Sequence, residues 1–123
     1  MVMSEKQIIS THYPYLPLTI TVRKRTETLE ALLDTGFDGD IVLPPGLITN
    51  GKPPDSYARW TLADGSRVLA PAYLGTVAIE GLEDAGPFPA MINILGNEPL
   101  VGRALTNRFC ITLDHGRRVT LVA

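Results

Sequence analysis

The sequence contains few features of disulfide-rich, membrane or nucleic-acid-binding proteins. Its one cysteine, Cys110, cannot form an internal disulfide, and the neighbours Phe109 and Ile111 indicate a buried thiol in a reducing compartment. No apolar run approaches the roughly 18 residues that a membrane-spanning helix needs. Eleven Lys and Arg residues nearly balance thirteen Asp and Glu residues, and they are spread along the chain. We therefore expect no membrane contact and no nucleic-acid partner.

Signals for secretion, metal binding and a second domain are also missing. The N-terminal segment has no basic start followed by a long apolar run, which favours a cytoplasmic location. His12 and His115 share no ligand spacing, so neither a metal nor a cofactor is expected. The 123 residues are 45% hydrophobic and contain no low-complexity tract or repeat, which predicts a single domain over residues 1–123.

Helical periodicity is scarce, because no window keeps an apolar helical period for three turns. Ten prolines and eleven glycines interrupt the chain at short intervals. The pattern predicts an all-β protein with one short helix around residues 103–107. The expected strands are 18–23, 29–33, 41–43, a long hairpin over 57–73 that turns at Asp64-Gly65, a pair at 74–79 and 88–94, and a last pair at 110–114 and 118–123.

The stretch ALLDTGFDGD, residues 31–40, contains three carboxylates within seven positions. It does not fit a helix-loop-helix calcium site, because a loop that starts at Asp34 has Gly36 at position 3 and Pro45 at position 12. Instead, an apolar strand leads directly into Asp34, and a carboxylate in such a setting needs a partner. An aspartic hydrolase needs two carboxyl groups that share a proton, whereas the chain has one Asp-Thr-Gly triplet. A two-fold homodimer would supply the second carboxyl group.

The segments ALLDTGFDGDIVLP and EPLVGRALTNRFCITLD, in this order, resemble the retropepsin-like (clan AA) aspartic proteases, the family that contains the retroviral proteases. DTGF, the ADG hairpin and PLVG are most similar to a bacterial single-domain branch. The resemblance covers about residues 16–122 and leaves 1–15 as an N-terminal arm. It implies a closed β-barrel or sandwich with one short C-terminal helix, active as a two-fold homodimer on a peptide or protein substrate.

The resemblance also implies roles for individual residues. Asp34 would be the catalytic carboxylate, Thr35 would grip its symmetry mate, and Gly36 would offer a backbone contact to substrate. Asp38 and Arg103 would form a structural ion pair. The supporting residues would be Leu33, Leu100, Val101 and Gly102, and the substrate-binding and flap residues would be Phe37, Ala63, Asp64, Gly65 and Ser66.

Several alternatives remain open at this level. Phe37 stands where many family members carry Ala, Ser or Thr, and its bulk is expected to narrow a substrate pocket. Trp60 and Tyr73 could line the cleft or pack against the sheet. The resemblance favours an aspartic endopeptidase without a cofactor. The alternative is a non-hydrolytic binding or dimerisation module with the same fold, because a fold does not establish chemistry.

Overall fold

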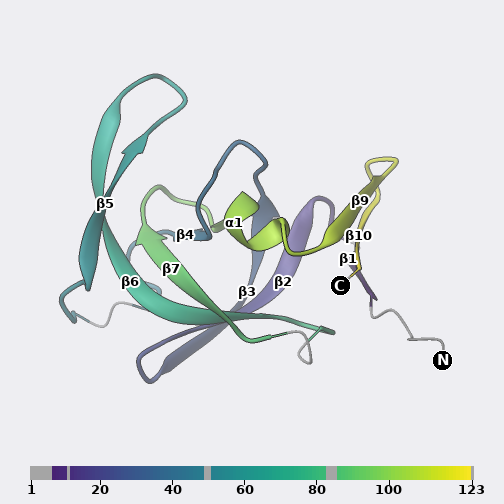
Figure 1. Cartoon of the computed structure of the whole chain (residues 1–123), viewed down its shortest axis with the longest axis horizontal. Helices are drawn as coiled ribbons and strands as arrows, with labels where there is room; N and C mark the ends of the chain where they lie inside the picture. Colours follow the sequence, from purple (N-terminus) through teal and green to yellow (C-terminus); the bar gives the residue numbers. More distant parts are fainter. Residues whose placement is uncertain (1–6, 11, 49–50, 83–85, 123) are drawn as a thin grey trace.

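The computed structural model describes residues 7–10, 12–48, 51–82 and 86–122 (Figure 1). Within these ranges the chain forms strands and one short helix, which confirms the predicted all-β class. The elements are β1 (Gln7–Ser10), β2 (Tyr15–Val22), β3 (Arg25–Leu33), β4 (Ile41–Leu43), β5 (Ser56–Thr61), β6 (Arg67–Ile79), β7 (Phe88–Ile94), β8 (Leu100–Val101), α1 (Arg103–Thr106), β9 (Cys110–Asp114) and β10 (Arg118–Val122).

Six strands close into a barrel. The larger sheet has the order β2-β3-β8-β4-β7-β6-β5, and an additional pairing between β2 and β6 closes the ring. Strand β5 lies outside the ring and pairs with the first half of β6, so that the two form a projecting hairpin at the upper left of Figure 1. This hairpin is the one that the sequence predicts over residues 57–73, and it is called the flap below.

The barrel interior follows from alternation along the strands. In β2 every second side chain is buried, and Leu16, Leu18, Ile20 and Val22 all point inward. Removing each such side chain from water stabilises the fold by about 1.5–3 kcal/mol. The largest fully buried side chains come from β2, β4, β6, β7, the helix and β10, together with Leu82. The apolar core therefore runs from the barrel to the terminal sheet.

Strand β6 is longer than the sequence suggests. It continues through residues 73–74, where two separate runs were expected, and pairs in turn with β5, β7 and β2. Gly75 permits this change of partners, because a Cβ atom there would lie 2.4 Å from the backbone oxygen of Thr21. One continuous strand therefore links the flap to the barrel.

The turn between β2 and β3 is also tighter than expected. The sequence predicted strands at 18–23 and 29–33 with a turn between them, but β3 begins at Arg25. Thr26 and Thr28 face Thr21 and Thr19 across the strand pair, with hydroxyl oxygens 3.0 and 3.3 Å apart. These cross-strand contacts extend the ladder almost to its tip.

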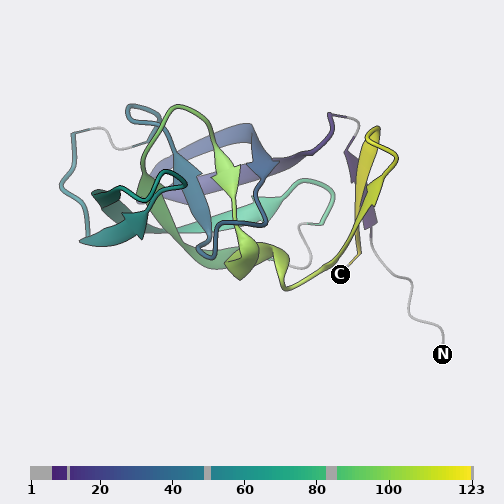
Figure 2. The ribbon, with the colours of Figure 1, turned by 90° about the horizontal axis from the view of Figure 1, so that it is seen from above.

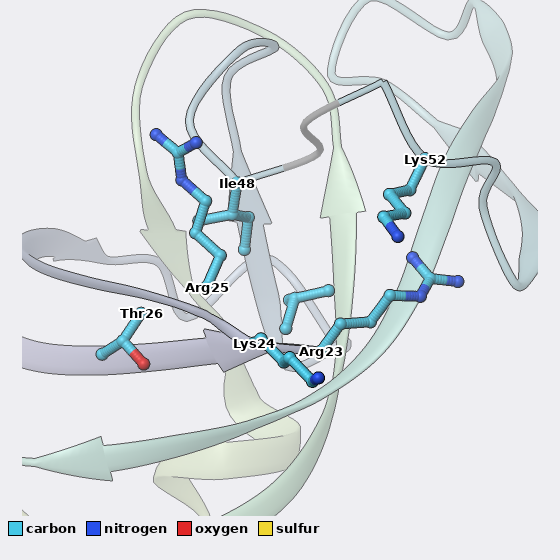
Figure 3. A pocket seen from close by; sticks show the side chains of 7 residues that line it. Arg23, Lys24, Arg25, Thr26, Ile48 and Lys52 are labelled. Carbon is cyan, nitrogen blue, oxygen red and sulfur yellow. The ribbon is translucent and has the colours of Figure 1, made fainter.

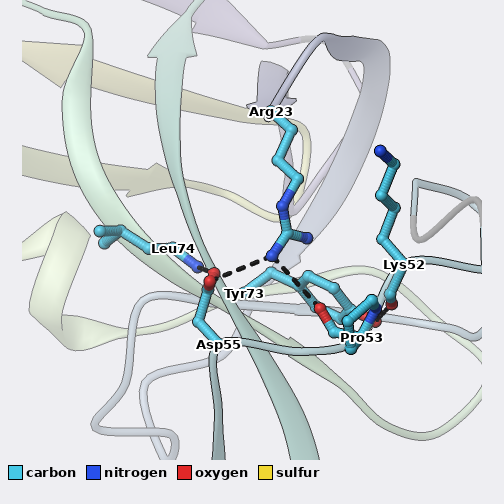
Figure 4. Close-up of polar contacts among 6 residues, drawn as sticks. All are labelled: Arg23, Lys52, Pro53, Asp55, Tyr73 and Leu74. Atoms are coloured by element: carbon cyan, nitrogen blue, oxygen red, sulfur yellow. Dashed lines mark hydrogen bonds and ion pairs between the residues drawn. The ribbon is translucent and has the colours of Figure 1, made fainter.

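Arg23, in this turn, fastens the segment that leads into β5 (Figure 4). Its φ of 55° is unusual for a residue with a side chain, and its guanidinium lies 5.3 Å from the ring centre of Tyr73. One Nη atom donates to the Pro53 oxygen at 3.2 Å and to Asp55 at 3.1 Å. The other Asp55 oxygen accepts the Leu74 N–H at 2.8 Å. Tyr73 is buried and its hydroxyl donates to the Lys52 oxygen at 2.6 Å, so it anchors the base of the flap.

A second, three-stranded sheet has the order β1-β10-β9. It lies at the opposite end of the molecule from the flap hairpin (Figure 2). The sequence assigned residues 1–15 to an N-terminal arm, and within it Gln7–Ser10 pairs with β10; residues 1–6 and 11 lie outside the described part. Cys110 is exposed, contrary to the expected burial, because its side chain points away from the core while Phe109 and Ile111 pack against it.

No helix in the described ranges is long and apolar enough to span a membrane.

Candidate active site

Asp34 follows β3 directly and is held by three backbone hydrogen bonds. Its N–H donates to the Val101 oxygen at 3.0 Å, and its own carbonyl accepts the Phe37 N–H at 3.3 Å. The Gly36 N–H donates to carboxylate oxygen Oδ1 at 2.9 Å. The side chain is half-buried. The backbone of residues 34–37 therefore fixes the direction of the carboxylate.

The segment after β8 crosses behind this loop. Three N–H groups donate to it: Gly102 to the Asp40 oxygen at 2.8 Å, Arg103 to the Phe37 oxygen at 2.8 Å, and Ala104 to the Gly39 oxygen at 3.1 Å. A Cβ atom at position 102 would lie 2.3 Å from the Gly39 oxygen. Only glycine fits this crossing. Val101 pairs with Leu33 in β3 and with Ile41 in β4, so the crossing is part of the barrel wall.

Asp40 has a structural contact that the sequence did not indicate. Its Oδ2 atom accepts the Met91 N–H of β7 at 3.0 Å, which ties the end of the loop to the neighbouring strand. Its position directly before the buried strand β4 was a usable signal, because a carboxylate there needs a donor.

Phe37 connects the Asp34 loop to the flap. Its ring meets the Trp60 ring of β5 edge-on, with centres 4.9 Å apart. The indole N–H of Trp60 donates to Asn93 at 3.2 Å, and the buried Asn93 amide donates to the Ile41 oxygen at 3.1 Å. The sequence missed Asn93 because its partners lie 33 and 52 residues away.

A cleft of about 620 Å³ lies between the Asp34 loop and the flap. Its apolar walls come chiefly from Phe37, Trp60 and Leu62, and its charged groups are Asp34, Asp38, Arg59 and Arg103. The full lining is Asp34, Gly36, Phe37, Asp38, Val42, Arg59, Trp60, Thr61, Leu62, Ala63, Leu95, Leu100 and Arg103. Trp60 thus both lines the cleft and packs against the barrel.

Other residues singled out in the sequence lie beside this cleft. Thr35 is exposed next to Asp34, while Leu33 is half-buried. Val101 and Gly102 are buried behind the loop. The structure therefore brings the two motifs together, although they are more than sixty residues apart.

The hairpin tip is a compact hydrogen-bonded turn. Both the N–H and the hydroxyl of Ser66 donate to Asp64 Oδ1, at 2.8 and 2.6 Å. Leu62 and Ser66 close the turn through a backbone bond of 2.8 Å, and Gly65 adopts a φ of 86°. The two Ser66 donors hold the pKa of Asp64 below its usual value of 3.8. An ionised Asp64 thus rigidifies the tip.

The expected ion pair between Asp38 and Arg103 is not formed. No side-chain nitrogen of Arg103 lies within 4.0 Å of a carboxylate oxygen of Asp38, although both residues line the cleft. Arg103 contributes its backbone N–H to the loop instead. Both side chains are exposed, and an exposed pair of this kind gains only about 0–1 kcal/mol.

A second groove, of about 640 Å³, lies at the β2–β3 turn (Figure 3). It is lined by Val22, Arg23, Lys24, Arg25, Thr26, Ile48 and Lys52, and none of these is a predicted site residue. Among the described residues, no group of three or more His, Cys, Asp or Glu side chains could hold a metal ion.

Comparison with known proteins adds one observation on the fold. No protein-family model matches the sequence, and no curated protein sequence matches it. A solved structure, a retropepsin-like aspartic protease from Rickettsia conorii, is similar over 98% of this chain and 96% of its own, with a TM-score of 0.57 and 16% identity. The fold is retropepsin-like. The cleft therefore lies on a retropepsin-like barrel, between the Asp-Thr-Gly loop and the hairpin of β5 and β6.

Proposed function

We propose that this chain is an aspartic endopeptidase that works as a homodimer, with one Asp34 carboxyl group from each copy. The observation that carries the proposal is the position of Asp34. It lies at the end of β3, oriented by the Gly36 N–H, in a cleft that residues 59–63 of the hairpin also line, within a retropepsin-like fold. The chain contains one such triplet, so the second carboxyl group has to come from another copy.

The proposed chemistry uses two adjacent carboxyl groups that share one proton. Like charges in close contact cannot both ionise easily, so one group stays protonated. The ionised group takes a proton from a water molecule as the water oxygen attacks the peptide carbonyl carbon, and the protonated group gives its proton to the carbonyl oxygen. Proton transfer to the peptide nitrogen then accompanies breakage of the C–N bond. The products are a new carboxyl end and a new amino end.

The flap would order the substrate and exclude water. A peptide bound in extended form between the flap and the Asp34 loop can satisfy its backbone by hydrogen bonds, while side chains enter pockets on alternate sides. Phe37, Trp60 and Leu62 offer the apolar contacts on the wall that the structure describes. Closure of such a lid strengthens electrostatic interactions around the dyad, because water leaves.

The test is incubation of the wild type and the Asp34→Asn variant with a diverse peptide mixture, followed by mass spectrometry. We expect the wild type to cleave and the variant to lose activity by about 10²–10⁴-fold or more, because it lacks the shared proton. Equal cleavage by both would assign the activity to a contaminant or to another site. A folded dimeric wild type that cleaves no peptide would favour the non-hydrolytic binding module.

A further inference from the structure

The charged residues of the cleft are unequally partnered. Asp34 accepts the Gly36 N–H, and Asp38 lies on the same wall as Arg103, whose N–H donates to Phe37 in the same loop. Arg59 comes from the opposite wall, on flap strand β5. No carboxylate oxygen of a described residue lies within 4.0 Å of its side-chain nitrogens. Among the described residues that line the cleft, the hairpin wall contributes Arg59 and no acidic residue, whereas the opposite wall contributes Asp34 and Asp38 beside Arg103.

A second arginine lies beside it on the flap. Arg59 pairs with Leu69 and Thr61 pairs with Arg67, so Arg59 and Arg67 are diagonal neighbours on one face of the hairpin, while Trp60 points to the other face. The Cα atoms of such neighbours are about 7–8 Å apart, and like charges on side chains that start so near each other repel. The Arg67 side chain likewise has no acidic partner among the described residues. An anion between the two would relieve the repulsion.

The space for such an anion is present. A hollow of about 430 Å³ lies on the flap beside the cleft, lined by Arg59, Trp60, Thr61, Arg67, Val68 and Leu69. Arg59, Trp60 and Thr61 line both spaces, so the hollow continues the cleft along the flap. β5 is the end strand of its sheet, so an extended peptide can run along it with successive side chains on opposite faces, one toward Trp60 and the next toward Arg59.

A peptide bound under the flap would make Arg59 and Arg67 favour carboxylate side chains over neutral ones. Arg59 and Arg67 are exposed and hydrated in the free chain. A bound peptide removes part of that water. Removing water from a guanidinium costs free energy unless a new hydrogen-bond partner replaces the water. The planar guanidinium with its five N–H donors matches a carboxylate well. Aliphatic or amide side chains would leave the charge unpaired.

We propose that Arg59, supported by Arg67, gives the cleft a preference for peptides that carry an acidic side chain beside the apolar residue held near Phe37 and Trp60. This inference rests on the proposed peptidase function, because it assigns the substrate class of the same cleft. Arg59 acts here as a specificity residue that contacts the substrate side chain and takes no part in proton transfer.

The experiment compares peptide pairs that differ only by Glu or Gln at each position around the cleavage site. For the wild type we expect kcat/KM to be about tenfold higher for Glu at one or two positions, the size expected of one charge-assisted hydrogen bond in a partly exposed site. The preference should weaken as salt rises from 0.1 to 1 M, because the screening length falls from about 10 Å to about 3 Å. Arg59→Gln should remove the preference, so that its kcat/KM values for the Glu and Gln peptides become equal.

Lys24→Gln is the matched control, since it removes one positive charge from an exposed side chain outside the cleft. It should keep the wild-type preference. A wild-type Glu/Gln ratio of one, with cleavage intact, would overturn the inference and leave the peptidase proposal standing. An unchanged preference in Arg59→Gln would overturn it as well.

If no peptide is cleaved, measurements of peptide binding still test the preference for acidic side chains separately from the peptidase function. Trp60 is the chain's one tryptophan and lies next to Arg59 in the cleft, so its fluorescence reports occupancy. In the Asp34→Asn background, Glu peptides should bind about tenfold more tightly than Gln peptides, and Arg59→Gln should abolish the difference. Equal binding of both peptides would overturn the inference, whatever the outcome for hydrolysis.

Discussion

At the scale of single residues, the Asp34 loop depends on backbone groups more than on side chains. The carboxylate is oriented by one N–H of its own loop, and the loop is held from behind by the N–H groups of residues 102–104. Phe37, which follows the Asp-Thr-Gly triplet, packs on Trp60 and so connects the loop to the flap. The Phe37 ring therefore forms the part of the cleft wall where the Asp34 loop meets the flap.

Gly102→Ala should destabilise the fold by about 1–3 kcal/mol or more, because the added methyl group would overlap backbone oxygens of Gly39 and Phe37, which cannot move aside like a side chain. Urea denaturation measures the change. Ala104→Ser is the matched control, since it adds one heavy atom at a neighbouring exposed position and should stay within about 0.5 kcal/mol. Equal effects of the two substitutions would contradict the close crossing.

The sequence indicated some of these residues and could not indicate others. Asp34 and Gly102 belong to two short motifs whose order along the chain resembles the retropepsin-like family. Asn93 and Asp40 act through partners on other strands, so their roles depend on which strands become neighbours. The expected pair of Asp38 and Arg103 failed for a related reason: the motif brings the two side chains to one cleft but does not fix two exposed, flexible chains in contact.

At the scale of elements, the flap hairpin is held at both ends. Arg23, Asp55 and Tyr73 fix its base, and the Asp64 turn closes its tip. Asp64-Gly65 predicted the turn correctly because its signal is local. The uninterrupted run of β6 was not predicted, since it changes partner at Gly75 through contacts far away in sequence.

The Asp64 tip should respond to acid. The pKa of Asp64 is lowered in the folded chain, so its ionised form stabilises the turn above the unfolded value of 3.8, and this stabilisation is lost as the pH falls through the lower folded value. The amide shift of Ser66 in NMR spectra should follow this titration, with a midpoint below 3.8. Asp64→Asn should remove the titration, and a wild-type midpoint at or above 3.8 would contradict the assignment.

At the scale of the whole molecule, the retropepsin-like barrel has the flap at one end and the sheet of β1, β9 and β10 at the other. Alternation in β2 and the short spacing of turns were sufficient to predict the all-β class. The sheet with β1 was not predicted, because four residues of ordinary strand propensity acquire their order only from β10, more than a hundred residues away.

Mixing tests the shared dyad of the proposed homodimer directly. When equal amounts of wild type and Asp34→Asn are unfolded and refolded together, random pairing leaves about a quarter of the dimers with two Asp34 side chains. Activity per total dimer should then fall to about a quarter of the wild-type value, because a mixed dimer lacks one carboxyl group. A value of one half would mean that each copy acts alone. Light scattering on the same samples confirms or refutes the dimer.

The pairing of β1 with β10 also has a consequence for the order of folding. β1 can form its ladder only with a strand more than a hundred residues further along the chain. The barrel strands β2 to β8 lie closer together in sequence. Contacts between segments as distant as β1 and β10 form slowly. A folding chain would therefore complete the barrel that carries the Asp34 cleft before the sheet of β1, β9 and β10.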